Sequence, residues 1–432
     1  MSAASHTVRL MGKTFRARVL RGSAEVGGSC VEISYDGATV LVDAGSPLSG
    51  ENSGLPPAVG MGESGPLPLA VLVSHGHQDH WGLVPTLPST IPVWIGRGAA
   101  DILRAADFWG SGVDLREAGH FRDREPFRVG PFTVTPYLAD HSGFDAYSLH
   151  IEAGGRSLFY TGDLRGHGRK HCLQRLLASP PRDVHALVME GTSLRPNGVD
   201  GEDAHSAMDS ETAVERALAL TLSQTDGMVV VLSSPQNVDR AVTAYRAALR
   251  AGRDVAVDLY SADVLEATGR PTIPRVHADW PRMRAFVPLH QRVKVKDAGQ
   301  FDRVATVKER RVFGDGLALG RGRWMLLGSY QREIPGLIRS GVLNGGAVVW
   351  SMWDGYLDEP SGMRLRHLLD QASIPLIHHH TSGHASVADL KLLVDAIAPD
   401  WLVPIHTEAP TMYESTFGVR TVREGDGAWW TV

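Results

Sequence analysis

The chain has 432 residues, of which 43% are hydrophobic, and a formal net charge of −5 at pH 7. This length allows two or three domains with sizeable cores, and the charge excludes a protein that coats nucleic acid with an overall basic surface. The two cysteines exclude a disulfide framework. A membrane span needs roughly 20 apolar residues, and the sequence contains no such run and no signal-peptide pattern at its start, so we expect a cytoplasmic protein.

The first third of the chain reads as short strands and helices in alternation. Strands are expected over 15–45, with a hairpin turn at Asp36-Gly37. The apolar run 69–73 predicts a buried strand, and a strand over 91–96 is followed by a helix near 98–108. This alternation indicates α/β layers.

A different rhythm begins near residue 205. Ser210 is the expected N-cap of a helix that buries Val214, Leu218 and Leu222. The run 237–252 predicts a helix that turns Leu249 inward. Strands are expected on both sides of that helix, over 228–232 and 254–259. A charged, irregular stretch is expected over 292–323, followed by strands over 324–328 and 347–352 and a helix over 362–371. Strand, helix and strand in succession are typical of a doubly wound sheet.

The end of the chain resembles its beginning. A strand runs into the polar stretch HTSGHAS, and a helix is expected over 387–397. The segment WLVPIHTE, residues 401–408, predicts a strand that ends in His406. We therefore predict an insertion, residues 205–365, within one metal-binding domain made of residues 1–204 and 366–432.

The stretch SHGHQDHWG, residues 74–82, places four ligand-type side chains directly after a buried strand. Three more apolar runs end in such residues, and binding sites collect at the carboxyl ends of strands in α/β sheets. Buried imidazole and carboxylate groups are costly unless they are paired or bound to metal. The predicted metal ligands are His75, His77, Asp79, His80, His141, Asp163 and His406.

Seven ligands exceed the four or so that one zinc ion takes, so we expect two metals that share a carboxylate and hold a hydroxide between them. The predicted first metal is bound by His75, His77 and His141, and the second by Asp79, His80 and His406, with Asp163 as the bridge. Nitrogen and oxygen donors without thiolate favour zinc, with manganese as the alternative.

The string His-x-His-x-Asp-His, followed by single His, Asp and His residues at long spacing, resembles the metallo-β-lactamase fold. Glu190 in LVMEGT, HTSGHAS at 380–386 and PIHTE around His406 resemble motifs of its β-CASP branch, whose members are nucleases, and of ribonuclease J in particular. The resemblance implies an αββα sandwich with an inserted doubly wound α/β domain.

The resemblance also implies roles for further residues. His384 would act in catalysis beside Asp79, and Glu190 would orient His384 or a ligand histidine. The substrate phosphate would be held by Ser233, Ser234, His380 and Ser382. The implied function is a metal-dependent phosphodiester hydrolase acting on single-stranded RNA, with DNA as the alternative polymer. A homodimer is compatible with the resemblance.

Two features depart from the ribonuclease J pattern. That pattern has Ser-Asn shortly before the Arg, whereas here Pro235 and Gln236 intervene between Ser234 and Asn237, which predicts a reshaped phosphate pocket. The chain also ends soon after His406, without the extra C-terminal domain of ribonuclease J. The rival hypothesis is a dimetal hydrolase of a small ester, thioester or cyclic phosphodiester, because one fold supports several chemistries. A non-catalytic binding subunit is a third reading, disfavoured because every ligand is present.

Several charged residues near the motifs have structural interpretations. Asp43 is expected to be a strand-end acid behind the site, and Asp140 is either a turn residue, a supporting acid or a participant in chemistry. Arg165, Arg169 and Lys170 follow Asp163 and are interpreted as a solvated loop rather than a guide for a polyanion.

Overall fold

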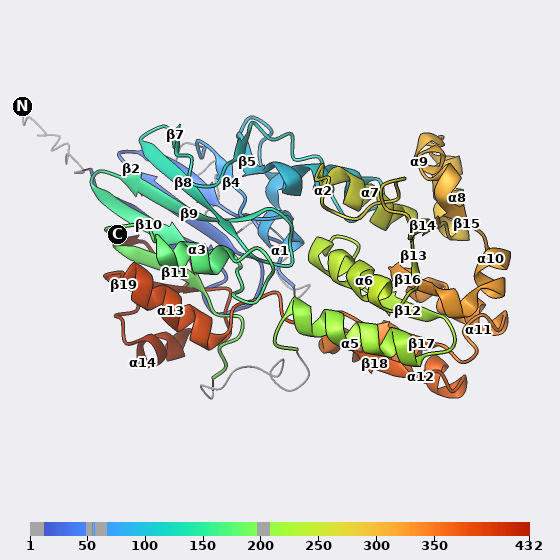
Figure 1. Ribbon diagram of the computed structural model, residues 1–432. Helices are drawn as coiled ribbons and strands as arrows, with labels where there is room; N and C mark the ends of the chain where they lie inside the picture. Colours follow the sequence, from blue (N-terminus) through green and yellow to red (C-terminus); the bar gives the residue numbers. More distant parts are fainter. Residues whose placement is uncertain (1–12, 49–53, 55, 57–66, 197–207) are drawn as a thin grey trace, which may run out of the picture.

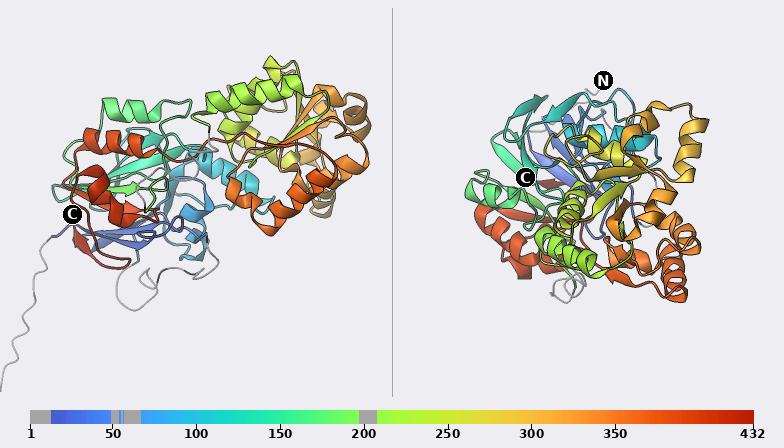
Figure 2. Two further views of the ribbon diagram at one scale, coloured as in Figure 1. Left: turned by 90° about the horizontal axis from the view of Figure 1, so that it is seen from below. Right: turned by 45° about the vertical axis from the view of Figure 1, so that its right-hand side comes forward.

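The structure is a computed structural model that describes residues 13–48, 54, 56, 67–196 and 208–432. It has two parts that lie side by side (Figures 1 and 2): a sandwich of two sheets, and a third sheet with helices on both faces. Within those residues, no helix has the length and apolar character to cross a membrane.

The first sheet of the sandwich has the strand order β20-β1-β2-β3-β4-β5-β6. Its strands are β1 (Arg16–Arg21), β2 (Cys30–Tyr35), β3 (Ala38–Val42), β4 (Val71–Leu72), β5 (Val93–Gly96), β6 (Gly119–Phe121) and β20 (Trp430–Thr431). The predicted hairpin joins β2 to β3, which pair antiparallel. Asp36 and Gly37 have φ angles of 51° and 79°, and positive φ at both central residues is what a tight hairpin turn requires.

The second sheet has the order β19-β11-β10-β9-β8-β7. Its strands are β7 (Phe127–Val129), β8 (Phe132–Ala139), β9 (Ala146–Ala153), β10 (Arg156–Tyr160), β11 (Ala186–Glu190) and β19 (Trp401–Ile405). Strand β19 pairs in parallel with β11, so the last part of the chain completes a sheet that its first part began. Side chains from both sheets, such as Val31, Ile33, Phe132 and Leu149, form the buried core between them.

Helices cover the outer faces of the sandwich. On the first sheet lie α1 (Gln78–Trp81), the short 3₁₀ turn η1 (Val84–Thr86) and α2 (Arg97–Asp107), and on the second lie α3 (Cys172–Ala178), α13 (Val387–Ile397), η6 (Pro410–Met412) and α14 (Tyr413–Phe417). Each layer of helices has its own apolar cluster against its sheet. The helix, sheet, sheet, helix order is the predicted αββα sandwich.

The third sheet has the order β15-β14-β13-β16-β12-β17-β18, with all neighbours parallel. Its strands are β12 (Val229–Leu232), β13 (Asp254–Val257), β14 (Met283–Phe286), β15 (Arg311–Val312), β16 (Trp324–Gly328), β17 (Ala347–Trp350) and β18 (Leu376–His378). The run of four buried valine and leucine residues in β12 fits a parallel strand that is covered on both faces. This sheet is the predicted inserted doubly wound unit.

Two apolar clusters flank the third sheet. Side chains of the first cluster come from the helices α5 (Glu211–Gln224), α6 (Val238–Arg250), α7 (Leu259–Ala267), α8 (Leu289–Asp297) and α9 (Asp302–Ala305). Those of the second come from α10 (Gly314–Leu319), α11 (Ile334–Arg339) and α12 (Pro360–Gln371). Short 3₁₀ turns lie between elements: η2 (Lys308–Arg310), η3 (Arg321–Arg323), η4 (Tyr330–Arg332) and η5 (Asp354–Leu357). Ser210 caps α5 as predicted, because its side chain accepts a hydrogen bond from the Ala213 amide.

Some local predictions were wrong. Residues 292–323 are not irregular: α8 extends into them and α9, β15 and α10 follow. Single buried side chains such as Val295 and Leu317 anchor these short elements, and isolated apolar residues give no periodic signal. Leu249, in the last turn of α6, is 42% exposed rather than turned inward.

The predicted junctions of the insertion remain predictions. The junction at 204 and 205 lies outside the described residues. The junction at 365 and 366 falls within α12, and β18, which follows it, pairs with β17 as the edge of the third sheet.

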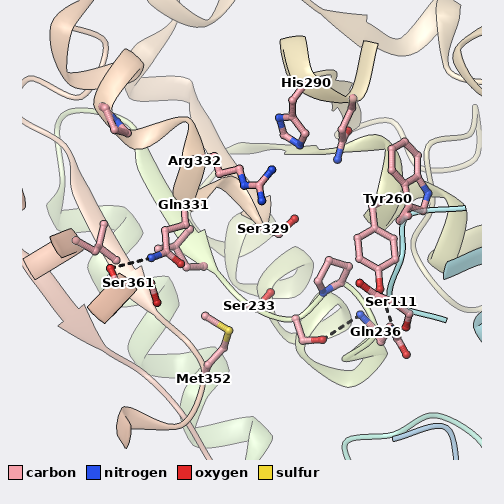
Figure 3. A pocket seen from close by; sticks show the side chains of 18 of the residues that line it. Ser111, Ser233, Gln236, Tyr260, His290, Ser329, Gln331, Arg332, Met352 and Ser361 are labelled. Atoms are coloured by element: carbon pink, nitrogen blue, oxygen red, sulfur yellow. Dashed lines mark hydrogen bonds between the residues drawn. The ribbon is translucent and has the colours of Figure 1, made fainter. Parts of the chain in front are cut away.

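A cavity of about 940 Å³ lies at the carboxyl ends of β12 and β16 (Figure 3). The chain leaves β12 for β13 and leaves β16 for β17, which lie in opposite directions along the sheet. These two strand ends are therefore a switch point of the doubly wound sheet, the place where such folds bind ligands.

Helix α5 offers a matched test of core packing. Leu218 is fully buried against α6 and the third sheet, whereas Leu220 on the same helix is 56% exposed. We expect Leu218→Ala to lower the free energy of unfolding by about 2–5 kcal/mol, because it removes buried methyl groups and leaves a cavity. Leu220→Ala should change it by less than about 0.5 kcal/mol in the same urea titration. Equal effects would contradict the orientation of α5.

Candidate metal centre

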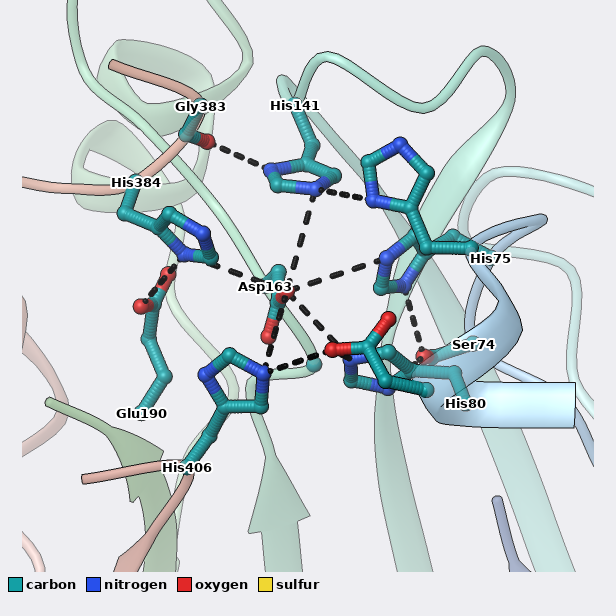
Figure 4. Close-up of polar contacts among 12 residues, drawn as sticks. Ser74, His75, His80, His141, Asp163, Glu190, Gly383, His384 and His406 are labelled. Carbon is teal, nitrogen blue, oxygen red and sulfur yellow. Dashed lines mark hydrogen bonds and ion pairs between the residues drawn. The ribbon is translucent and has the colours of Figure 1, made fainter. Parts of the chain in front are cut away.

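Six strands of the sandwich end at or shortly before a ligand-type side chain. Figure 4 shows several of these side chains gathered around Asp163. The residues and the strands that precede them are Asp43 (β3), His75 to His80 (β4), His141 (β8), Asp163 (β10), Glu190 (the last residue of β11) and His406 (β19). Gly45 makes room for the loop between β4 and α1, since a Cβ atom there would lie 1.6 Å from the carbonyl oxygen of Asp79.

The side chains form overlapping groups, each with ligand atoms within 4.8 Å of one another. His75, His77, His141 and Asp163 form one group, and Asp79, His80 and His406 form another. The Asp163 carboxylate lies between them, because its Oδ2 is 3.7 Å from His75 Nε2 and 3.3 Å from His80 Nε2. A third group joins Asp163 to Glu190, His384 and His406. The residues of the two predicted ligand sets thus lie together around Asp163, and their roles as metal ligands remain predictions.

Four ligand histidines are fixed by contacts at the ring nitrogen that faces away from the centre. The Nδ1 atom of His75 lies 3.0 Å from Ser74 Oγ, that of His80 2.7 Å from Asp43 Oδ2, that of His141 2.5 Å from the Gly383 carbonyl oxygen, and that of His406 2.8 Å from Thr192 Oγ1. Such contacts orient the ring and direct its other nitrogen to a metal.

Several atoms that face the centre have no hydrogen-bond partner. The Nε2 atoms of His75 and His80 and the Oδ1 atom of Asp163 are buried without a hydrogen bond in the described residues. His141 Nε2 and His77 Nδ1 point at each other at 3.0 Å. Buried polar atoms are normally paired, so this donor set fits a divalent metal.

The protonation of the first group also suits a metal. Burial lowers the pKa of His75, His77 and His141, and the neighbouring imidazoles add to the effect at His75 and His141. Neutral imidazole is the form that binds metal. These three side chains are therefore in their ligand state at neutral pH.

Asp43 has the supporting role expected of it. Its carboxylate accepts hydrogen bonds from the Ser74 amide and hydroxyl and from the Tyr160 hydroxyl, at 2.7–2.8 Å, and it faces His80. It is fully buried. One carboxylate thus holds β3, β4 and β10 together behind the centre.

Glu190 connects His384 to the ligand set. Its Oε2 lies 2.9 Å from His384 Nδ1 and also accepts from the Thr192 hydroxyl, which contacts His406 Nδ1. Burial would lower the pKa of His384, but the carboxylates of Glu190 and Asp163 outweigh it and raise that pKa to about 9. His384 is thus a protonated imidazole beside the centre, and Glu190 faces both histidines as expected.

The four expected phosphate-binding residues follow two parallel strands of the third sheet, β12 and β18. Ser233 and Ser234 line the cavity at the end of β12. Ser382 accepts a hydrogen bond from the His384 amide, and His380 Nδ1 lies 3.5 Å from Arg240 Nη1. Within the described residues, no hydrogen bond joins the two pairs.

The interpretation of Arg165 and Arg169 as a solvated loop was wrong. The Arg165 guanidinium is completely buried and contacts Asp140, Glu211 and Asp239 at 3.2, 3.5 and 2.5 Å. Arg169 pairs with Glu215 at 2.7 Å. The sequence contains no local signal for these contacts, because the acidic partners are 25 to 74 residues away along the chain. Asp140 is thereby a structural acid of the loop.

Sequence reasoning also missed Glu211 and Arg240, which complete this network. Arg240 is fully buried, pairs with Glu211 at 3.1 Å and donates to the Ser351 hydroxyl at 2.6 Å. Arg165 lies two residues after Asp163, and Glu211 and Arg240 belong to α5 and α6. The ion pairs therefore connect the loop that follows Asp163 to the helices of the third sheet.

Comparisons with known proteins agree with this geometry. Residues 38–228 match the family model described as a beta-lactamase superfamily domain. Ribonuclease J of Mycoplasma genitalium is 23% identical over 410 residues, which cover 90% of this chain and 67% of that protein. Ribonuclease J 1 of Streptococcus pyogenes is 23% identical over 412 residues, with the same coverage. The chain is thus similar to ribonuclease J over most of its length, and part of it resembles a beta-lactamase superfamily domain.

The protein also shares its fold with a solved structure. The crystal structure of a protein of unknown function from Enterococcus faecalis V583 superposes with a TM-score of 0.76 at 19% identity. The match covers 97% of this chain and all of that one. At this identity the likeness concerns the fold, in which sandwich and third sheet occur together.

The buried ion-pair network predicts a large effect of Glu211→Gln. The substitution removes the carboxylate that pairs with Arg240 and one of the three that pair with Arg165, and breaking a buried pair costs about 3–5 kcal/mol. We expect that loss in urea unfolding at pH 7. Glu309→Gln, at an exposed position, is the control and should change stability by less than about 0.5 kcal/mol.

Wild type and the Glu211→Gln variant can also be compared as a function of pH. Burial raises the pKa of Glu211, but Arg240 and Arg165 outweigh it and lower the pKa from its ordinary 4.5 to about 2. Because the folded value lies below the unfolded one, the stabilisation is complete above pH 4.5 and is lost as the pH falls towards 2. The stability difference between wild type and Glu211→Gln should therefore shrink below pH 4.5. A difference that grows on acidification would refute the ion pairs.

Proposed function

We propose that this protein is a metal-dependent ribonuclease that hydrolyses phosphodiester bonds of single-stranded RNA. The observation that carries the proposal is the pair of ligand groups that share Asp163, with His384 and Glu190 beside them. The similarity to ribonuclease J over 90% of the chain supports RNA as the substrate class.

Two metals are proposed, one held by His75, His77 and His141 and the other by Asp79, His80 and His406, with Asp163 between them. The donors are nitrogen and oxygen without thiolate, which supports zinc with manganese as the alternative. The chemistry that such metals supply when bound is activation of water near neutral pH and neutralisation of charge on the phosphoryl oxygens.

His384 is proposed as the proton donor of the reaction. Its Nδ1 faces Glu190, which leaves Nε2 as the atom that can donate to a phosphoryl or leaving oxygen. The raised pKa keeps the ring protonated at neutral pH. Glu190 sets the orientation of this ring and, through Thr192, that of His406.

Ser382 and His380 would position the substrate phosphate on the same loop. Burial, with the Arg240 charge as the next cause, lowers the pKa of His380 to about 3, so its imidazole would act as a neutral hydrogen-bonding group. The loop is anchored from behind, because the Ser382 carbonyl oxygen accepts from Arg165 and faces His167 Nε2.

The proposed metal site predicts a change in metal content. Wild-type protein dialysed against zinc should hold about two metals per chain, whereas His77→Ala, which removes one ligand, should hold about one. His367→Ala, at an exposed position far from the ligand groups in sequence, is the control and should match wild type. Elemental analysis provides the measurement. Wild-type protein that retains no metal would contradict the site.

The decisive experiment is a cleavage assay with a 5′-monophosphorylated, 3′-labelled single-stranded RNA and its DNA equivalent. Wild type with zinc or manganese should shorten the RNA, His77→Ala should be inactive, and His384→Ala should be slower by about 10²–10⁴-fold, the usual contribution of a general acid. His367→Ala should cleave at the wild-type rate.

Two outcomes would overturn the assignment. Metal-loaded protein that cleaves neither polymer but turns over a small ester, thioester or cyclic phosphodiester would favour the small-substrate hydrolase. RNA cleavage that is unaffected by His384→Ala would remove His384 from the reaction and leave the metal site as the only catalytic element.

A further inference from the structure

Arginines gather at the amino ends of the third sheet, at the edge opposite to its cavity. Arg282, Arg310 and Arg323 directly precede the strands β14, β15 and β16, and Arg284 lies within β14. Together with β13, these strands are parallel neighbours in the order β15-β14-β13-β16, so their amino ends meet at one edge. Neighbouring strands lie about 4.8 Å apart, which makes this arginine row roughly 14 Å long.

A single carboxylate neutralises part of the arginine row. Asp254, the first residue of β13, is buried and pairs with Arg282 at 3.3 Å and with Arg323 at 2.6 Å. Within the described residues, no other carboxylate forms an ion pair with the row. Asp279, which lies close by in the chain, pairs with His277 at 3.0 Å instead. The row therefore carries an excess of positive charge.

Two arginines of the row lie side by side without a carboxylate. The register of β14 and β15 pairs Ala285 with Arg311, which places Arg284 beside Arg310 one position earlier. Arg284 Nη1 donates to the Pro281 carbonyl oxygen at 2.5 Å, and Arg310 Nη1 lies 3.5 Å from the same oxygen. Burial, with the Arg310 charge as the next cause, lowers the pKa of Arg284. Two cations on one carbonyl oxygen repel each other, and an anion between them would remove that repulsion.

The arginine row is accessible to a ligand. The side chains of Arg282 and Arg323 are 41% and 64% exposed, and Arg284 and Arg310 are half-buried. Arg253, directly before β13, shows the contrasting case, because it is buried and donates to several backbone carbonyl oxygens, among them that of Gly227 at 2.7 Å. Arg253 therefore has a structural role and does not belong to the row.

The chemistry of the row favours phosphate groups as the ligand. The strand residues between the arginines, Asp254 and Met283, are buried, so the row exposes guanidinium groups rather than an apolar surface. Interfaces between proteins have apolar cores, whereas nucleic-acid backbones are bound by basic groups. Guanidinium groups bind phosphate through two parallel hydrogen bonds. On a chain with a net charge of −5, such a row is a local attraction for a polyanion.

From these contacts we propose that the arginine row is a second contact surface for RNA, which binds backbone phosphates distant from the bond that is cleaved. Arg284 and Arg310 bind one phosphate between them, and Arg282 and Arg323 bind its neighbours. The choice of RNA rests on the proposed function. The row itself shares no residue with the metal-ligand groups or with the cavity. Only an RNA long enough to reach both the metal centre and the row will use it.

The test is RNA binding by the full chain, measured by fluorescence anisotropy at low salt in the His77→Ala background, which prevents cleavage. The probes are labelled polyuridylate and a uridine pentanucleotide. Arg284→Gln and Arg310→Gln remove the charge and keep an amide that can donate to the Pro281 carbonyl oxygen. Together they should weaken polyuridylate binding tenfold or more and lower the slope of its salt dependence by about 0.7 for each arginine. Pentanucleotide binding should stay within twofold.

Arg128→Gln is the matched control. Arg128 is exposed on β7 of the sandwich, far from the arginine row (Figure 1), and forms no ion pair within the described residues. The variant should bind both probes within twofold of wild type. If the glutamine variants of the row unfold at a lower temperature, Arg284→Lys and Arg310→Lys decide, because they keep the charge. A salt slope equal to that of wild type in the lysine variants supports the row, and a slope as low as in the glutamine variants contradicts it.

The proposal fails if polyuridylate does not bind, or if it binds equally well to wild type and to the glutamine variants. Polyglutamate that binds through these arginines, where polyuridylate does not, would also overturn it, because the surface would then fit an acidic protein.

The failure of this proposal is distinct from that of the nuclease assignment. RNA cleavage by the wild type, with RNA binding that is independent of Arg284 and Arg310, would refute only the arginine row. RNA binding that depends on the two arginines, in a protein that cleaves no RNA, would refute only the nuclease.

Discussion

The structure depends on one buried carboxylate, that of Asp163. Its Oδ2 lies within 3.3–3.8 Å of ring nitrogens from His75, His80, His141, His384 and His406. Burial alone would raise the pKa of this carboxyl, but the imidazoles of His406 and His80 outweigh it and hold it well below its usual range. A buried charge of this kind is stable only with opposite charge around it. Both sheets of the sandwich supply that environment, because the strand ends of each are needed to surround one atom.

A network of buried ion pairs connects the loop after Asp163 to the insertion. Arg165 follows Asp163 by two residues and is neutralised by acids from the sandwich and from the helices α5 and α6. Glu211 sits between Arg165 and Arg240, and Arg240 reaches Ser351 and the neighbourhood of His380. The Arg165 guanidinium meets all of its acidic partners only when the sandwich and the insertion are both in place. The position of the third sheet relative to Asp163 is thus set by ion pairs that would be costly to break.

The metal centre and the cavity of the third sheet differ in the groups that they present. The metal centre gathers carboxylates and imidazoles, which suit a divalent cation. Among the described residues, the cavity is lined by guanidinium, ammonium and hydroxyl groups without a carboxylate. Gln236 and Trp109 bring the sandwich and the insertion together at the edge of that cavity.

The sequence by itself predicted the side chains that gather around Asp163, the αββα sandwich and the inserted doubly wound sheet. It could do so because His75, His77, Asp79 and His80 lie within one short motif, and because strand periodicity and the caps Ser210 and Asn237 are local. Only the tertiary structure decided the roles of Arg165, Glu211 and Arg240, which the sequence presents as ordinary surface charges. Those outcomes depend on which strand ends meet in space, and chain spacing carries no record of contacts between residues 46 to 215 positions apart.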